Sequence, residues 1–108
     1  MSGFIQTMTT VEKKEDAEKI ARVILEKRLG ACVQIAGPVS SHYWWQGKID
    51  SAEEYLCVIK SRAELYPELE AAIKKVHPYE VPEIMAVPVT SLSAEYGKWL
   101  EKELAPAS

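Results

Sequence analysis

The sequence predicts an α+β protein, with one domain over residues 1–108, in which helices pack on one face of an antiparallel sheet. Three observations favour this class. Strand-like and helix-like segments alternate along the chain, two long strand-like segments meet at Gln46-Gly47, and 47% of the residues are apolar while 27% are charged. This composition is typical of globular proteins and argues against disordered and fibrous classes.

The first two predicted elements are a strand from Phe4 to Thr9 and a helix from about Lys14 to Leu29. The strand segment is rich in β-branched and apolar residues. Gly30 follows the last apolar residue of the helix segment, where a glycine commonly ends a helix. The apolar residues that recur at helical spacing in this segment are Ala17, Ile20, Ala21 and Ile24.

A long hairpin follows, with strands from Ala31 to Trp45 and from Lys48 to Lys60 and a turn at Gln46-Gly47. We expect this hairpin to extend beyond the helices, because a strand rises about 3.3 Å per residue and a helix only 1.5 Å. Gly37-Pro38 lies inside the first strand. Because proline cannot donate a ladder hydrogen bond, we expect a bulge or bend there.

The second half of the chain again predicts a helix followed by a strand, and then adds a last helix. A turn over Ser61–Tyr66 leads to a helix beginning near Pro67, because proline suits a first helical turn. A strand over Ile84–Val89 contains Pro88, which indicates a sheet edge or a bulge. Ser93 can cap a last helix. The residues of this helix that share one face are Tyr96, Trp99, Leu100 and Leu104.

This order is that of a ferredoxin-like βαββαβ sandwich with an appended C-terminal helix. Residues 55–59 are apolar at five consecutive positions, which indicates burial on both faces of the sheet. Tyr43, Trp44 and Trp45 are consecutive strand residues, so aromatic surface points to both faces of the hairpin. Since one chain cannot cover both faces, we expect self-association through these aromatic residues.

Several functional classes are disfavoured. The chain has 13 Lys and Arg against 16 Asp and Glu, without a basic block that could follow phosphates, so we expect no nucleic-acid partner. No window is apolar enough to span a bilayer and no signal segment is evident, so we expect a cytoplasmic protein without a membrane partner. No nucleophile, base and orienting group fall into a catalytic spacing, so we expect no enzymatic activity.

The two cysteines are expected to be free thiols, as in a reducing cytosol. A turn centred between Gln46 and Gly47 pairs residues whose numbers sum to 93. Cys57 would then lie opposite Ala36, and Cys32 opposite Ser61, which is too far apart for a disulfide. Core packing is the favoured role for both cysteines.

The segment around His77 carries the main site hypothesis. His77, Tyr79 and Glu80 combine a nitrogen donor, a phenol and a carboxylate in a proline-braced loop, which suits a metal or ligand site. The alternative is that His77 only interacts with the end of the preceding helix. Lys60 could face an anion or simply protect a strand end. His42 is interpreted as structural, and Trp44 and Trp45 as interface residues in preference to a stacking platform.

Three strings in the same order resemble the CutA family of divalent-ion tolerance proteins. They are Leu25–Cys32 (LEKRLGAC), Tyr43–Ile49 (YWWQGKI) and His77–Glu83 (HPYEVPE). The resemblance implies a ferredoxin-like homotrimer similar to PII signalling proteins and a link to copper and other divalent metals. Some members have a Cys and two adjacent His as copper ligands, at positions that hold Thr9, Val76 and His77 here. Two of those three ligands are therefore absent from this chain.

Three hypotheses follow. The first is a non-enzymatic homotrimer for tolerance of copper and other divalent ions, with weak binding of Cu(II) or another divalent ion that includes His77. The second is a PII-like sensor of a small anionic ligand in intersubunit clefts lined by Lys60, His77, Tyr79 and Glu80. The third is a trimeric scaffold for partner proteins. A chain with two histidines and two cysteines that are expected to be buried is poor in ligands for a dedicated copper site, which weighs against the first hypothesis.

Overall fold

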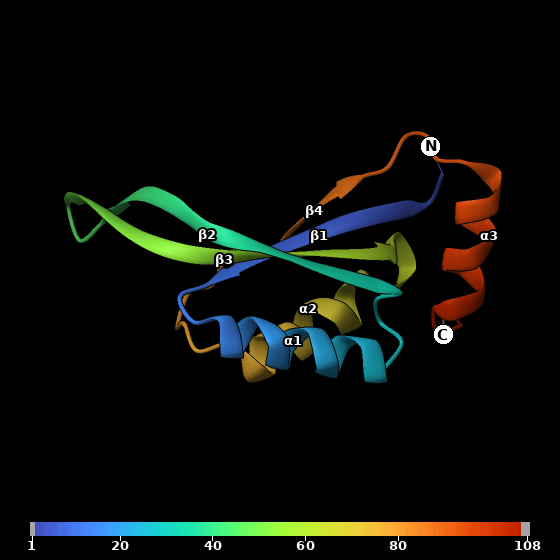
Figure 1. Cartoon of the computed structure of the whole chain (residues 1–108), viewed down its shortest axis with the longest axis horizontal. Coiled ribbons are helices and arrows are strands. Elements are labelled where there is room, and N and C mark those ends of the chain that lie inside the picture. The colour runs from blue at the N-terminus through green and yellow to red at the C-terminus, as the bar shows by residue number, and fades with distance from the viewer. Residues whose placement is uncertain (1, 107–108) are drawn as a thin grey trace.

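A computed structural model describes residues 2–106, and its elements follow the predicted order (Figure 1). The strands are β1 (Phe4–Val11), β2 (Cys32–Trp45), β3 (Lys48–Arg62) and β4 (Met85–Pro88). The helices are α1 (Lys14–Glu26), the short 3-10 helix η1 (Ala63–Leu65), α2 (Tyr66–Val76) and α3 (Ala94–Glu103). The predicted α+β class and the βαββαβ order with an added helix are confirmed.

The four strands form one antiparallel sheet in the order β2-β3-β1-β4. Figure 1 shows α1 and α2 beneath one face of this sheet, with α3 across the end far from the hairpin turn. The β2–β3 hairpin extends well beyond the helices, as expected, and the molecule measures 44 × 25 × 22 Å. None of the described helices covers the opposite face, which we call the open face.

The end of α1 differs from the prediction. The helix stops at Glu26, and Arg28 then adopts a φ of 55°, so Arg28 and not Gly30 takes the left-handed conformation that ends the helix. Gly30 has another role. A Cβ on Gly30 would lie 2.6 Å from Cγ2 of Ile59 and 2.9 Å from Cγ2 of Ile24, so glycine lets the chain pass closely between α1 and β3.

The predicted irregularity at Gly37-Pro38 is confirmed, since the β2–β3 register shifts between Ala36 and Val39. From the turn to the Val39–Glu54 pair, partner numbers sum to 93 as predicted; beyond the bulge they sum to 92. The predicted cysteine partners are therefore wrong by one residue. Cys57 lies opposite Ile35 and Cys32 opposite Lys60, and both thiols are free.

The elements of the second half agree closely with those predicted from the sequence. Pro67 lies in the first turn of α2, and Ser93 Oγ accepts the Tyr96 N–H at 3.2 Å to cap α3. β4 is an edge strand, as Pro88 indicates. The predicted turn over Ser61–Tyr66 begins later than expected, because Ser61 and Arg62 still pair with β1 before η1 starts.

The hydrophobic core lies between the helices and the covered face of the sheet. Fully buried residues from both layers meet there, including Ile20 and Ile24 of α1, Ile59 of β3 and Leu69 and Ile73 of α2. Leu100 and Leu104 bring the C-terminal segment onto the same cluster. Among the described residues, no helix is long and apolar enough to cross a membrane.

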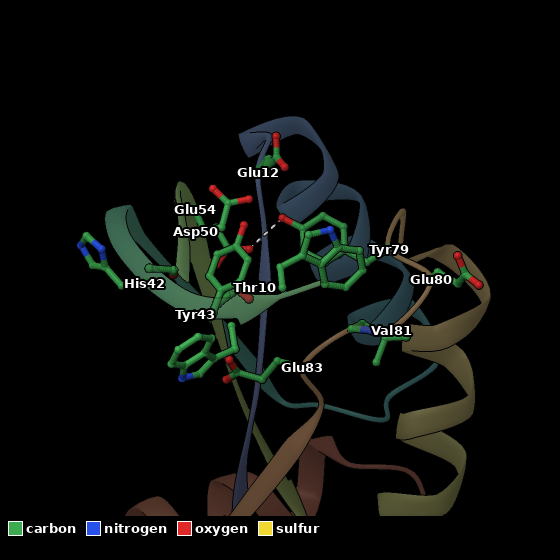
Figure 2. Close-up of a pocket in the computed structure, with 14 residues that line it drawn as sticks. Thr10, Glu12, His42, Tyr43, Asp50, Glu54, Tyr79, Glu80, Val81 and Glu83 are labelled. Carbon is green, nitrogen blue, oxygen red and sulfur yellow. Dashed lines mark hydrogen bonds between the residues drawn. The ribbon is translucent and has the colours of Figure 1, made fainter. Parts of the chain in front are cut away.

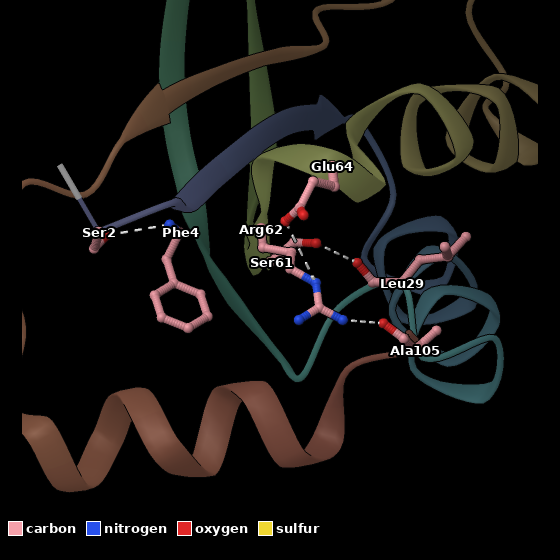
Figure 3. A network of polar contacts seen from close by, with 7 residues as sticks. All are labelled: Ser2, Phe4, Leu29, Ser61, Arg62, Glu64 and Ala105. Atoms are coloured by element: carbon pink, nitrogen blue, oxygen red, sulfur yellow. Dashed lines mark hydrogen bonds and ion pairs between the residues drawn. The ribbon is translucent and has the colours of Figure 1, made fainter. Parts of the chain in front are cut away.

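Polar contacts fasten the chain ends to this core (Figure 3). Arg62 donates to the carbonyl of Ala105, and the Ala105 N–H donates to the Arg28 carbonyl at 2.8 Å. Ser61 Oγ donates to the Leu29 carbonyl at 2.7 Å, which ties β3 to the segment after α1. These bonds hold the end of the sheet that is remote from the hairpin turn.

Candidate functional site

A cleft of about 900 Å³ lies on the open face, between the hairpin and the loop that follows α2 (Figure 2). It is lined by residues from three places. β1 and the residue after it supply Thr10 and Glu12, the hairpin supplies residues 41–45, Asp50 and Glu54, and the loop supplies residues 79–83. The sheet thus forms the floor, and the hairpin and the loop form the walls.

Strand pairing explains which hairpin side chains face the cleft. Directly opposed residues share a face, so Tyr43 lies beside Asp50, and Trp45 beside Lys48. Trp44 and Ile49 form the intervening pair and point to the other face of the hairpin. In Figure 2, Tyr43, Asp50 and Glu54 gather at the cleft, whereas His42 points away from it.

Glu54 and Tyr79 join the two walls. Tyr79 Oη donates to Glu54 Oε2 at 2.7 Å, and Glu54 is only 7% exposed. Burial raises the pKa of Tyr79, and the hydrogen bond to Glu54 and the charges of Glu54 and Glu12 raise it further. The phenol therefore remains a neutral donor at physiological pH.

The residues that line the cleft carry negative charge. Its lining includes five carboxylate residues and neither Lys nor Arg. The pKa of Tyr43 is raised by desolvation and by the charges of Asp50, Glu54 and Glu12. Any charged ligand that this cleft attracts as it stands is a cation.

His77 connects the loop after α2 to β1 through two hydrogen bonds. Its Nδ1 accepts the Tyr79 N–H at 3.1 Å, and its Nε2–H donates to the Thr10 carbonyl at 3.0 Å. The two rings meet edge to face, with centroids 4.8 Å apart. Burial lowers the pKa of His77, although the Thr10 hydrogen bond and the charges of Asp16 and Glu54 oppose the shift. His77 is thus a neutral imidazole with both nitrogens bonded to backbone.

The predicted site residues are only partly together in one chain. Tyr79 and Glu80 line the cleft, but Glu80 points outward in Figure 2. His77 contacts the Tyr79 ring but is not one of the residues that line the cleft. Lys60 pairs with Cys32 and Gln6, at the end of the sheet far from the cleft. An anion pocket that combined Lys60 with Tyr79 would need residues from two chains.

Metal ligands do not converge in the described residues, where no group of three or more His, Cys, Asp or Glu could hold a metal ion. Thr9 is fully buried, and its Oγ1 has no hydrogen-bond partner in the described structure. Val76 packs against the core. A metal ion bound by His77 would have to displace one of its two backbone hydrogen bonds.

Sequence reasoning missed Glu12, Asp50 and Glu54 as site residues. A signal for Asp50 was available, because the predicted register already placed it opposite Tyr43. Glu54 could not be found in this way, since its burial and its bond to Tyr79 depend on how the loop after α2 folds back over the hairpin.

The predicted interface residues are exposed in the single chain. Trp44 is 74% exposed, Trp45 52% and Tyr43 39%, and Ile49 beside Trp44 is 69% exposed. Trp45 and Tyr43 lie on the cleft face, whereas Trp44 and Ile49 form an apolar pair on the other face. Interface formation by these residues stays a prediction.

Comparisons with known proteins agree on one family. Residues 5–103 match the family model described as "CutA1 divalent ion tolerance protein". The chain is 39% identical over 102 residues to "Divalent-cation tolerance protein CutA" of Archaeoglobus fulgidus, covering 94% of this chain and 97% of that protein. It is 40% identical over 106 residues to "Protein CutA" of Mus musculus, covering 94% of this chain and 60% of that protein.

Solved structures give the same result. The divalent cation tolerance protein Cut A1 from Thermus thermophilus superposes with a TM-score of 0.92 at 36% identity, covering 94% of this chain and 99% of that one. CutA1 from Oryza sativa superposes with a TM-score of 0.92 at 35% identity, covering 94% of each chain. The likeness therefore includes the hairpin as well as the layers around the core.

Proposed function

This chain belongs to the CutA1 divalent ion tolerance protein family, and from that premise we propose that it acts, without catalysis, in tolerance of copper and other divalent metal ions. The observation that carries the proposal is the match over residues 5–103, which includes both walls of the cleft. The role comes from the names of the relatives. The negative potential of the cleft supports it, because such a surface concentrates cations.

We infer weak metal binding. Both nitrogens of His77 are engaged, and the carboxylates around the cleft are spread over its walls. Divalent ions held by scattered carboxylates keep much of their hydration and bind loosely. His77 is the candidate nitrogen ligand for Cu(II), through exchange of the Nδ1 bond for the metal.

We propose a PII-like homotrimer as the working form. Support comes from apolar groups that one chain leaves exposed, including Met85, which is 49% exposed on the open face, and the Trp44–Ile49 pair on the hairpin. In a ring of three copies, the hairpin of each would cover part of its neighbour. The two free thiols favour a reducing compartment such as the cytosol.

The second hypothesis, a sensor of a small anion, requires the partner subunit to supply the positive charge. The carboxylates of the cleft oppose anion binding within one chain. The scaffold hypothesis has no particular surface in its favour beyond those assigned to self-association. Metal tolerance is therefore the function that we propose.

The test combines binding with phenotype. Calorimetric titration with Cu(II) and Zn(II) should give weak, saturable binding to the wild-type chain, and His77→Ala should weaken Cu(II) binding more than His42→Ala does. Cells that lack the chain should grow more slowly in added copper and recover when it is restored. Equal copper sensitivity with and without the chain would contradict the proposal, and unchanged affinity in His77→Ala would remove His77 as a ligand.

A further inference from the structure

The long hairpin loses the support of β1 at a definite point. The last pair between β1 and β3 joins Val11 to Tyr55. Residues 39–54 lie beyond this pair, and Figure 1 shows this part of the hairpin extending past the helices as well. The direction of these residues relative to the core therefore depends on contacts at the base of the hairpin.

A bulge interrupts the β2–β3 ladder at the same place. The register shifts between Ala36 and Val39, and Val39 then pairs with Glu54. Glu54 is thus the first β3 residue beyond both the bulge and the last pair with β1. Gly37 in the bulge packs closely on it, since a Cβ there would lie 2.9 Å from the Glu54 carbonyl oxygen. A bulge bends its strand and increases the local twist, so small changes at this point redirect the hairpin.

The side chain of Glu54 ties this point to another part of the fold. Tyr79 Oη donates to Glu54 Oε2 at 2.7 Å, and Glu54 is only 7% exposed (Figure 2). A hydrogen bond to a carboxylate that is largely removed from water is stronger than one between two neutral groups. The bond therefore holds the base of the hairpin against the loop after α2.

The loop is fixed in turn to the end of β1. His77 Nδ1 accepts the Tyr79 N–H at 3.1 Å, and its Nε2–H donates to the Thr10 carbonyl at 3.0 Å. Thr10 directly precedes Val11, where the pairing with β3 ends. The hydrogen bonds thus run from β1 through His77 and Tyr79 to Glu54, and they span the point where the ladder to β1 stops.

We propose that the Tyr79–Glu54 hydrogen bond is a brace that sets the direction of the hairpin, which makes Tyr79 and Glu54 positioning residues for self-association. The hairpin carries the aromatic residues that are predicted to contact neighbouring chains. Holding it in the associating direction before assembly reduces the ordering cost of the interface. The effect on assembly rests on the trimer proposed above, whereas the brace itself is a property of one chain.

Hydrogen exchange followed by mass spectrometry measures the brace. Tyr79→Phe removes only the hydroxyl group and should speed exchange in residues 39–53 about ten-fold, while residues 57–61 in the core part of β3 keep their wild-type rate. Glu54→Ala should act in the same way, and the double variant should add nothing further, because both changes remove one bond. Glu54→Gln keeps an oxygen that can accept from Tyr79, so its rate should lie closer to wild type. Tyr96→Phe is the control, because it removes a hydroxyl group from α3, far from the hairpin turn.

Two exchange results would overturn the brace. One is an unchanged rate in residues 39–53 of Tyr79→Phe. The other is an equal increase in residues 39–53 and 57–61, which would show a general loss of stability.

Light scattering along a urea series tests the effect on assembly. Tyr79→Phe should lose the mass of the assembly at a lower urea concentration than Tyr96→Phe does. Faster exchange in the hairpin without this change would overturn the role in self-association. A wild-type mass of 12.1 kDa would contradict the trimer instead, and the exchange rates would still decide whether the brace exists.

Discussion

The two faces of the sheet differ although the same strand contributes to both. On the covered face, Cys57 and Ile59 of β3 are fully buried under α1 and α2. On the open face, Val58 is only partly buried, Met85 is 49% exposed, and the hairpin beyond exposes Trp45. Apolar groups are therefore satisfied within one chain on one face and left exposed on the other. The covered face specifies the fold, whereas the open face and the hairpin are suited to contacts from outside the chain.

The strongest test of this comparison is removal of the hairpin tryptophans. Under the trimer proposal, Trp44 and Trp45 remove a few hundred Å² of surface from water, which is worth several kcal/mol per chain at about 25 cal/mol per Å². Trp44→Ser together with Trp45→Ser should therefore sharply lower the melting temperature and give aggregated or unfolded chains.

Light scattering provides the matching measurement. The wild-type chain should have a mass near three times 12.1 kDa at every practical dilution. A double variant that is a folded 12.1 kDa monomer would show that each chain covers its own sheet, and the trimer proposal would have to be abandoned.

A matched pair of isoleucines on β3 measures the difference between the two regions directly. Ile59 is fully buried in the core and Ile49 is 69% exposed on the hairpin. Ile59→Ala should reduce the free energy of unfolding by about 2–5 kcal/mol at any protein concentration, because it leaves a cavity.

Ile49→Ala should cost less, because its side chain is mostly exposed in the single chain and makes its remaining contacts between chains under the trimer proposal. Urea unfolding of the wild-type chain and of both variants at one protein concentration would measure the two costs. A cost for Ile49→Ala as large as that of Ile59→Ala would contradict the contrast between the two regions.

The covered face contains a buried hydroxyl group without a hydrogen-bond partner in the described structure, and a substitution can remove it. Thr9 is fully buried without a partner for Oγ1 in the described structure, whereas Ser61, also fully buried, donates to the Leu29 carbonyl. Thr9→Val should stabilise the chain by about 1 kcal/mol, because it replaces an unsatisfied hydroxyl by a methyl group of similar size. Ser61→Ala should destabilise it by about 1 kcal/mol. Thermal melts of both variants measure these changes in stability. A Thr9→Val variant that is less stable than wild type would mean that the Thr9 hydroxyl is hydrogen-bonded.

The sequence predicted the covered face better than the open one, for a physical reason. Helical spacing in residues 17–24 and the strand pattern around the Gln46-Gly47 turn are local signals. Such signals located the four strands and the three α-helices, whereas η1 lies in a segment that was predicted as a turn. Errors arose where tertiary packing decided the outcome. Gly30 was expected to end α1, but it serves close packing against Ile59, and the size of the Gly37-Pro38 bulge changed the cysteine partners by one residue.

The cleft was predicted less well because it joins segments that are distant in the chain. The HPYEVPE string correctly drew attention to the loop, and Tyr79 lies at the centre of the contact between the walls. Its partner Glu54 comes from a strand 25 residues away, and no local pattern distinguishes it from the exposed Glu53 beside it.

The smallest expected effect is a dependence of stability on pH that comes from His77. Burial lowers the folded-state pKa of His77 below its ordinary value of 6.5, so the unfolded chain binds a proton more readily than the folded chain. Stability from this residue is therefore complete above about pH 6.5 and declines as the pH falls from there to the folded pKa.

The hydrogen bonds of His77 also predict that protonation destabilises the folded chain, because a proton on Nδ1 would face the Tyr79 N–H that Nδ1 now accepts. Between about pH 6.5 and 5, before carboxylates titrate, the wild-type melting temperature should fall. His42→Gln should show the same fall, whereas His77→Gln should show a flatter profile over this range because it lacks the titrating group. Identical profiles for all three proteins would mean that His77 is protonated as easily in the folded chain as in the unfolded one, and that the loop carrying Tyr79 does not depend on its neutral imidazole.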